Sequence, residues 1–477
     1  MTPTYAERED QATSTRWALA GLAVSMLLAS LGISIASVAL PTLAQAFGAS
    51  FQAVQWIVLA YLLAVTTLIV SAGRLGDLLG HRRVLLAGLA IFTAASVFCA
   101  LSSSLTMLIA ARALQGLGAA ILMALTLALV RETVPRERTG SAMGLLGTMS
   151  AVGTALGPSL GGLLIAGPGW RAIFFVMVPL GAMGFLLAWR GLPATRHAPR
   201  RNRAGFDARG TLLLGLTLAA YALAMTVGRG HFGGLNAALL AAAVFGAGLF
   251  VLAEARAASP LVRPAMLRDP ALSASLAMNA LVATVMAVTL VVGPFYLSRA
   301  LGLDAVHVGA VLSVGPVVSA LSGIPAGRLV DRLGAWSMVV AGLLLMVAGT
   351  VALSMLPAIF GLAGYIAALA VLAPGYQLFL AGNNTAVMAD VVQEQRGVIS
   401  GLLSLSRNLG FVTGASVMGA VFAAAVGTSD VAAAAPDAVA FGLRIAFAVA
   451  AGLIAIALVL AIIGRVGARP ATAAPGS

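Results

Sequence analysis

The sequence contains no lysine, one cysteine and few charged residues of any kind. Only 9% of its 477 residues are charged, whereas 61% are hydrophobic. A soluble domain of this composition would expose large apolar patches to water, so the composition excludes a soluble enzyme or binding module and predicts an integral membrane protein. Because Cys99 is alone, no internal disulfide can form, and we expect this residue to serve in packing rather than as a catalytic thiol.

Signatures of metal and nucleotide sites are also missing. The chain has only four histidines, all in or near predicted loops, at positions 81, 197, 231 and 307. This scatter predicts no metal or heme site. The Gly116-Leu117-Gly118 sequence lies inside a predicted helix with no lysine after it, so it does not form a phosphate-binding loop. We therefore expect no enzymatic activity, no cofactor and no nucleic-acid partner.

Long apolar runs fill most of the chain. They are about 20 residues long, which suits a helix that crosses roughly 30 Å of hydrocarbon and exceeds the roughly 10 residues of a membrane β-strand. We predict an all-α membrane protein with fourteen transmembrane helices near residues 17–40, 54–70, 84–100, 105–130, 141–165, 172–189, 211–227, 235–255, 271–297, 307–324, 336–355, 357–380, 397–426 and 441–464. The break at Leu356-Pro357 is the shortest of the predicted connections.

The predicted helices form two bundles of six with two extra helices between them. The predicted segments are an N-terminal tail (1–16), a first six-helix bundle (17–189), a basic loop (190–209), an inserted helix pair (210–255), a linker (256–270), a second six-helix bundle (271–464) and a C-terminal tail (465–477). The six arginines of the basic loop either touch anionic headgroups or simply retain this loop on the cytoplasmic side.

Arginine placement orients this topology. With both termini in the cytoplasm, 22 of the 28 arginines lie on the cytoplasmic side. Three lie outside, namely Arg171, Arg229 and Arg299, and three lie within predicted spans, namely Arg112, Arg407 and Arg444. Since basic residues prefer cytoplasmic loops, we expect a multi-pass protein of the bacterial cytoplasmic membrane with both termini inside. The net charge of +13 follows from this topology.

One eight-residue sequence occurs twice, as Gly73-Arg-Leu-Gly-Asp77-Leu-Leu-Gly80 and Gly327-Arg-Leu-Val-Asp331-Arg-Leu-Gly334. Six of its eight positions match, so the repeat predicts two structurally similar halves. A carboxylate beside arginines can pair in one conformation and separate in another, which suits a gating latch; the alternative is a plain basic turn. The gating candidates are Gly73, Asp77, Gly80, Arg82, Arg83, Gly327, Asp331 and Arg332.

Arg112 lies inside the predicted fourth helix, and Gln115 follows it on the same helix face. A buried arginine costs several kcal/mol unless it faces a polar interior or a partner. We therefore expect Arg112 and Gln115, together with Asp77, to relay charge or protons. The alternative is an arginine whose head reaches the membrane surface.

The predicted fifth helix is rich in glycine. Gly153, Gly157 and Gly161 recur every four residues and form a smooth face for close helix packing. Pro158 removes one backbone hydrogen bond and kinks the helix beside this face, and Gly162 follows. We expect these five residues to form a hinge or seal between the two halves, with static packing as the alternative.

These motifs resemble the signatures of the major facilitator superfamily, and the glycine-rich fifth helix resembles the antiporter motif of its drug exporters. Val38-Ala-Leu-Pro41 and Trp170-Arg171 extend the resemblance, which covers nearly the whole chain. Fourteen helices point to the drug:proton antiporter branch. The resemblance implies proton-driven export of a small molecule by alternating access, in a protein that we expect to be monomeric and to need no cofactor beyond the proton gradient.

Two positions depart from that pattern. Gly32 stands where such exporters often carry an aspartate, and Met177 stands where the sixth helix usually has asparagine. None of the fifteen acidic residues falls at mid-membrane depth; Glu254 and Asp390 come nearest. The remaining groups that could carry a proton are Asp77 and, on the outer side, Asp304 and His307. A uniporter or importer of an organic anion with the same fold is therefore the alternative function.

Polar and aromatic residues within the predicted spans are candidates to line a substrate cavity. They are Gln55, Trp56, Tyr61, Arg112, Asn279, Tyr376, Gln377, Asn383, Asn384, Arg407 and Asn408. This set contains two arginines and no acid, which favours an anionic or neutral substrate over a cation. Arg407 could instead pair across the bundle without touching substrate.

Overall fold

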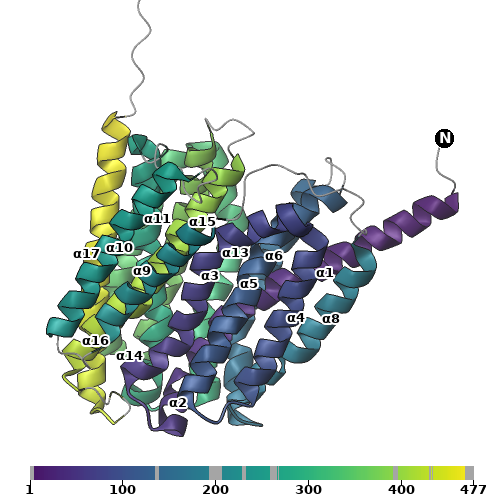
Figure 1. The fold of residues 1–477 in the computed structure, drawn as a ribbon. Helices are drawn as coiled ribbons and strands as arrows, with labels where there is room; N and C mark the ends of the chain where they lie inside the picture. Colours follow the sequence, from purple (N-terminus) through teal and green to yellow (C-terminus); the bar gives the residue numbers. More distant parts are fainter. Residues whose placement is uncertain are drawn as a thin grey trace, which may run out of the picture.

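A computed structural model describes residues 5–134, 139–192, 207–227, 233–257, 266, 268–389, 396–428, 431 and 433–467. Within these residues every regular element is a helix, and the helices run side by side as long rods (Figure 1). The prediction of an all-α membrane fold is confirmed. Most of the predicted basic loop, together with His197, His231 and Asp390, lies outside the described residues.

The first bundle contains α1 (Tyr5–Val38), α2 (Leu40–Phe47), α3 (Phe51–Leu79), α4 (His81–Ala100), α5 (Leu105–Thr133), α6 (Thr139–Ala166), α7 (Ala172–Phe175) and α8 (Met177–Gly191). Serine side chains cap two of these helices. Ser50 accepts a hydrogen bond from the Ala53 amide at the start of α3, and Ser104 accepts one from the Met107 amide at the start of α5. The first helix begins at Tyr5, well before the predicted start at Trp17.

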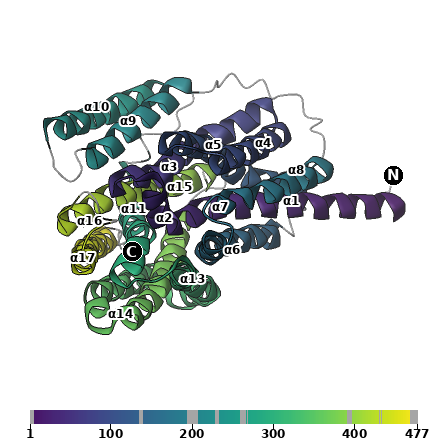
Figure 2. The same ribbon diagram turned by 90° about the horizontal axis from the view of Figure 1, so that it is seen from below.

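The inserted pair and the second bundle follow in order along the chain. They contain α9 (Ala208–Thr226), α10 (Gly234–Arg256), α11 (Pro270–Val291), α12 (Gly293–Phe295), the π-helical turn η3 (Tyr296–Ala300), α13 (Ala305–Leu333), α14 (Ala335–Met388), α15 (Arg396–Thr413), the π-helical turn η4 (Gly414–Met418), α16 (Gly419–Val426) and α17 (Pro436–Gly467). Figure 2 shows α9 and α10 together at one edge, beside α3.

The longest helix, α14, folds into two apolar arms, each long enough to cross a membrane. Its 54 residues would extend about 80 Å if straight. At Gly361 the backbone turns to φ 54° and ψ −128°, a conformation that glycine reaches readily. Gly342 then packs against Phe379, and Gly349 against Leu372, so the two arms run antiparallel.

This reversal completes the fourteen spans. The described residues contain 13 apolar helices long enough to cross a membrane, and α14 is one of them but folds into two arms. The predicted break at Leu356-Pro357 is wrong, because Pro357 lies inside the first arm and the chain reverses at Gly361. A proline removes only one backbone donor, whereas the reversal needs a positive φ.

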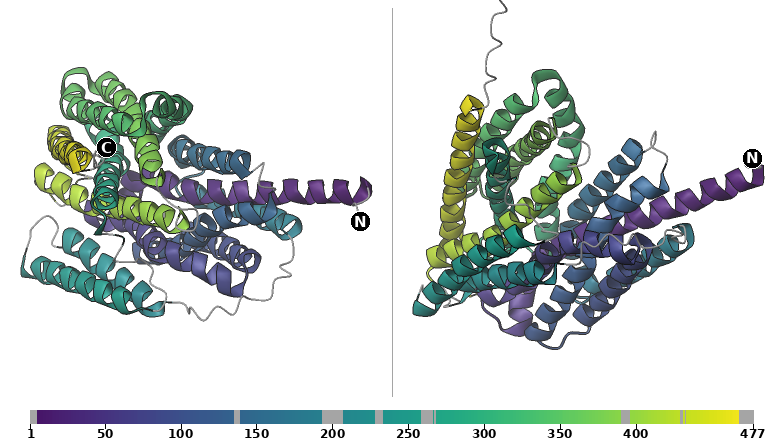
Figure 3. Two further views of the ribbon diagram at one scale, coloured as in Figure 1. Left: turned by 90° about the horizontal axis from the view of Figure 1, so that it is seen from above. Right: turned by 45° about the horizontal axis from the view of Figure 1, so that its top comes forward.

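Both ends of the described chain lie on the same side of the bundle, which we call the terminus side (Figure 1). The short helix α2 lies at the opposite end, which we call the α2 side. Seen from the terminus side, the two bundles lie next to one another with α9 and α10 at their margin (Figure 3). We call the contact between the two bundles the seam.

The seam is closed on the α2 side. The Phe51 ring of α3 packs against Phe295 and Phe422 of the second bundle, with ring centroids 4.8 and 5.2 Å away. A Cβ atom added to Gly309 of α13 would overlap the Pro158 carbonyl oxygen of α6. The backbones of α6 and α13 therefore touch directly at this level.

The same two helices separate toward the terminus side. Gly144 and Gly147 lie 14 and 11 residues before Pro158 on one face of α6, and Gly323 lies 14 residues after Gly309 on α13. A Cβ atom added to any of these three glycines would meet no atom within 4 Å. The helices α6 and α13 are therefore in contact on the α2 side and apart at these three glycines on the terminus side.

Candidate functional site

Arg112 occupies the centre of a polar network inside the first bundle. Its side chain is 0% exposed. The Nε atom donates a hydrogen bond of 2.9 Å to the Ile57 carbonyl oxygen, and Nη1 donates to Oε1 of Gln115. The guanidinium also lies 4.3 Å above the ring centroid of Tyr61. One backbone oxygen, one side-chain oxygen and one aromatic face thus hold the positive charge of Arg112 between α3 and α5.

Gln115 extends this network to two further helices. Its Nε2 atom donates to the Ser96 hydroxyl of α4 at 2.8 Å and approaches the Met177 sulfur of α8 at 3.3 Å. Met177 is the residue that replaces the asparagine expected from the resemblance. The substitution therefore leaves a weak acceptor in contact with Gln115.

The side chain of Tyr61 lies against Gly32. A Cβ atom added there would lie 2.9 Å from the Tyr61 hydroxyl, which donates a hydrogen bond to the Ala29 carbonyl oxygen. The Tyr61 ring therefore fills the space that an aspartate side chain would need, and its π-face contacts Arg112 instead. Among the described side chains no carboxylate contacts Arg112, and its Nη2 atom is buried without a hydrogen-bond partner.

The repeated eight-residue sequence forms the same turn in both bundles. Gly80 between α3 and α4 has φ 95°, and Gly334 between α13 and α14 has φ 88°. Both turns lie on the terminus side. This similarity supports two related halves.

The predicted pairing of Asp77 with arginine is absent from the described part of the chain. Asp77 pairs instead with His81, one turn later, at 3.1 Å. Arg82 donates to the Trp189 carbonyl oxygen at the end of α8, at 2.6 Å. In the second copy Asp331 and Arg332 are both exposed. On the terminus side, no ion pair among these described residues joins the two bundles.

The glycine face of α6 packs within its own bundle. A Cβ atom on Gly153 would lie 2.6 Å from the Leu27 carbonyl oxygen of α1, and one on Gly157 would overlap the Ser34 hydroxyl. Gly161 faces Val38 in the same way. The expectation that these three glycines face the seam is wrong, because their periodicity defines a face without identifying the helix that covers it.

Pro158 and Gly162 form the α6 side of the seam. Pro158 meets Gly309, and a Cβ atom on Gly162 would overlap the Ala305 carbonyl oxygen of α13. Of the five residues predicted to form a seal, these two contact the second bundle. Because proline has no backbone N–H, α6 lacks one hydrogen-bond donor at the level where the two bundles touch.

Three predicted cavity residues hold helices together. Asn279 of α11 donates to the Leu403 carbonyl oxygen of α15 at 2.8 Å. Trp56 donates to the Thr226 hydroxyl of α9 at 3.1 Å, and Gln55 donates to the Ala415 carbonyl oxygen of η4 at 3.1 Å. These contacts correct the expectation that the three side chains line a cavity, since each satisfies a donor across a helix interface.

A second polar group lies between α14 and α15. Tyr376, Gln377 and Arg407 are half-buried. Asn383 is buried with both amide atoms unpartnered, as is the Nδ2 atom of Asn408. Asn384 is exposed. This part of the second bundle therefore contains one cation and buried amide atoms without hydrogen-bond partners.

Sequence reasoning missed Gln52, which precedes Gln55 by three residues on α3. Gln52 is buried, and both its amide atoms lack a hydrogen-bond partner. It lies beside Phe51, at the closed end of the seam. The Gln52-x-x-Gln55 spacing was visible in the sequence as a polar pair on one helix face.

The described carboxylates lie near helix ends. Glu254, at 2% exposure, is buried at the terminus-side end of α10 and approaches Gly210 together with Asp207. On the α2 side Asp304 caps α13 and accepts hydrogen bonds from the backbone amide and the Nδ1 atom of His307. These hydrogen bonds, the backbone one first, lower the pKa of Asp304.

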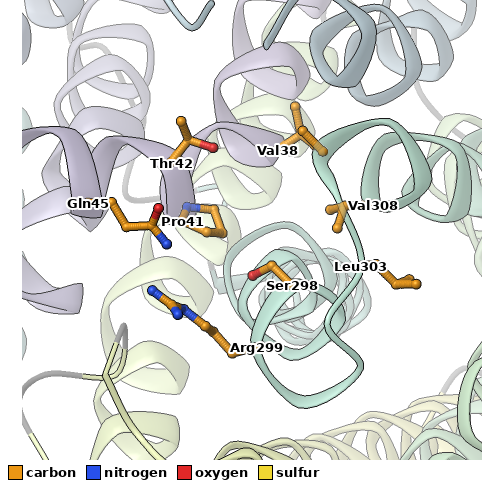
Figure 4. Close-up of a pocket in the computed structure, with 9 residues that line it drawn as sticks. Val38, Pro41, Thr42, Gln45, Ser298, Arg299, Leu303 and Val308 are labelled. Atoms are coloured by element: carbon orange, nitrogen blue, oxygen red, sulfur yellow. The ribbon is translucent and has the colours of Figure 1, made fainter. Parts of the chain in front are cut away.

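A pocket of about 200 Å³ lies on the α2 side of the seam (Figure 4). Both bundles contribute to it. Its lining residues are Val38, Pro41, Thr42, Gln45, Ser298, Arg299, Leu303, Ala305 and Val308. None of the predicted cavity residues belongs to this pocket.

Comparisons with known proteins agree with this architecture. Residues 22–415 match the model of the Major Facilitator Superfamily. The tetracenomycin C resistance and export protein of Streptomyces glaucescens is 31% identical over 86% of this chain and 76% of its own length. The riboflavin transporter RibZ of Clostridioides difficile (strain 630) is 29% identical over 84% of this chain and 87% of its own length.

A solved structure shares the fold. It is a bacterial homolog of the human lysosomal transporter Spinster, in an inward-facing and unoccupied conformation. Its TM-score is 0.66 at 17% identity, over 97% of this chain and 99% of that one.

Proposed function

The chain belongs to the major facilitator superfamily, and on this premise we propose that it exports small amphipathic drugs or metabolites from the bacterial cytoplasm in exchange for protons. As a member of this family it is a multi-pass membrane transporter and not an enzyme. We propose in addition that its transport is outward and coupled to protons.

The observation that carries this proposal is the asymmetry of the seam. The α6 and α13 backbones touch at Pro158 and Gly309, while the glycines further along both helices have open space beside them. A substrate could enter from the terminus side of such an arrangement and leave only after the α2 side had opened. The arginine distribution supports a cytoplasmic terminus side.

Proton coupling requires a group that takes up and releases a proton. Two carboxylate–imidazole pairs lie at opposite ends of the protein, Asp77 with His81 on the terminus side and Asp304 with His307 on the α2 side. We propose that protons pass through such pairs rather than through an acid in the first helix. Gly32 cannot supply that acid, and Tyr61 occupies the space.

The alternative function is a uniporter or importer of an organic anion. Arg112 and Arg407 favour it, because they place two cations in the spans without a described carboxylate beside them. The similarity to a riboflavin transporter also shows that relatives of this chain are not all drug exporters. The two functions therefore differ in the direction of substrate transport and in whether transport is coupled to protons.

Transport into inverted membrane vesicles tests the proposal. We expect vesicles that contain the protein to accumulate a fluorescent amphipathic dye when a proton gradient is present. Collapse of the gradient by an uncoupler should reduce the accumulation to the level of vesicles without the protein. Accumulation that persists after the uncoupler would reject the antiporter and favour the alternative.

A further inference from the structure

We propose that the pocket on the α2 side binds a small organic anion and that this ligand holds the seam closed. The site lies apart from the Arg112 network and from the Arg407 group. Its regulatory effect rests on the transport function proposed above, whereas its ligand chemistry rests on the pocket alone.

The pocket is built from both bundles. Thr42 and Gln45 come from α2, and Ser298 and Arg299 come from η3 of the second bundle. Figure 4 shows the side chains of Arg299 and Gln45 reaching toward one another across the pocket. A molecule that bonds to both would bridge the seam.

The polar lining selects an anion. Arg299 presents a planar guanidinium that can donate two parallel hydrogen bonds to a carboxylate. Thr42, Gln45 and Ser298 add neutral donors, and no carboxylate belongs to the lining. Asp304 is near in sequence, but its carboxylate is held by His307 at 2.8 Å.

The remaining wall is apolar. Val38 and Val308 are each 2% exposed, and Pro41 and Leu303 lie beside them. A volume of about 200 Å³ is below the range of about 300–1,000 Å³ that is usual for drug-sized ligands. The geometry therefore suits a small carboxylate with one ring or a short alkyl chain, with the carboxylate at Arg299.

Binding there is linked to the conformation of the transporter. The two walls approach one another only while the α2 side is closed, so the ligand has differential affinity for that state. An anion that occupies the pocket shifts the population toward the closed state and slows the step that opens the α2 side. We expect the anion to inhibit transport from the α2 side.

Benzoate and its neutral analogue benzamide test the pocket in the purified full-length protein. We expect benzoate to raise the melting temperature in a concentration-dependent way and benzamide to leave it unchanged. Arg299→Gln should weaken benzoate binding at least about tenfold, since it removes a charge-assisted pair. Gln45→Ala, at an exposed position, should weaken it about two- to fivefold because it removes one neutral hydrogen bond.

Arg444→Gln is the matched control. It removes one arginine from an exposed position on α17, and no hydrogen bond or ion pair of its side chain is found among the described residues, since the Ser354 hydroxyl donates to the Arg444 backbone carbonyl. Benzoate affinity should stay at the wild-type value in this variant. Equal binding of benzoate and benzamide, or unchanged benzoate affinity in Arg299→Gln, would overturn the proposal.

The melting measurement needs no transport, so it separates the two proposals. Absence of benzoate binding in a protein that exports dye would reject the anion site alone. Benzoate binding in a protein that does not export dye would support the site and reject the proposed exporter. In vesicles that export dye, benzoate on the α2 side should inhibit wild-type protein and spare Arg299→Gln; equal inhibition of both would contradict the linkage.

Discussion

Gly309→Val is expected to abolish transport while leaving each bundle folded. The added side chain would overlap the Pro158 carbonyl oxygen, and neither backbone can move without separating α6 from α13. The α2 side of the seam could then no longer close. A shift of roughly 1.4 kcal/mol in a conformational equilibrium already changes the population ratio tenfold, so we expect at least about a tenfold loss of dye transport.

The control for this variant is Gly452→Val on α17. Gly452 is exposed, and a Cβ atom added there would meet no atom within 4 Å. Both variants should be purified as monodisperse protein, and only Gly309→Val should lose transport in vesicles. Wild-type transport by Gly309→Val would show that the direct contact between α6 and α13 is not needed for the cycle.

Arg112→Met is expected to lose transport without losing stability. Methionine keeps part of the side-chain length and removes a buried charge for which no described carboxylate compensates. Removing a buried charge that has no described carboxylate partner relieves its desolvation cost, and this gain offsets the loss of the hydrogen bonds to Ile57 and Gln115. We therefore expect an unchanged or higher melting temperature together with at least about a tenfold fall in transport, because a charge that costs several kcal/mol in a membrane is retained for function.

Two further variants identify which property of Arg112 matters. Arg112→Lys keeps the charge but cannot donate to Ile57 and Gln115 in the same planar geometry, so it should restore transport only weakly. Tyr61→Phe keeps the aromatic face and should retain most transport. A large fall in the melting temperature of Arg112→Met with normal transport per folded molecule would assign Arg112 a structural role.

Local sequence signals predicted much of the fold. The repeated eight-residue sequence produces turns with nearly the same φ at Gly80 and Gly334, because glycine stands at the corresponding position of both copies. The length of the apolar runs predicted fourteen spans. The predicted position of the reversal inside α14 was wrong because proline is a conspicuous helix breaker. The positive φ at Gly361 depends instead on how the two arms pack.

The partners of buried residues were harder to predict. The spacing of Gly153, Gly157 and Gly161 identified a packing face, but only the three-dimensional structure shows that α1 covers it. Trp56 and Asn279 are polar groups within spans that could have faced a cavity. Their hydrogen bonds to α9 and α15 show that they satisfy donors between helices instead.

In the Arg112 network, residue types could be predicted from the sequence but their neighbours could not. The sequence identified Arg112 and Gln115 as unusual, and the structure places both in one buried network. It could not identify Tyr61 as the group that lies against the guanidinium, because α3 and α5 meet only in the folded protein. The same ring lies against Gly32, where the sequence lacks an acid.

Alternating exposure of the two sides of the seam is the central claim, and distances between spin labels test it most directly. Cys99 is the only cysteine and is buried, so a Cys99→Ala background leaves introduced cysteines as the only labelling sites. One labelled pair is Thr148→Cys and Leu321→Cys on the terminus side of α6 and α13. The other is Ala166→Cys and Ala310→Cys on the α2 side of the same helices, and all four positions are exposed.

We predict a long distance for the Thr148–Leu321 pair and a short one for the Ala166–Ala310 pair in protein without substrate. Addition of a transported dye, together with a change of pH in lipid nanodiscs, should populate a second state in which the first distance shortens and the second lengthens. Distances that stay fixed in both pairs, or that change in the same direction, would contradict the account.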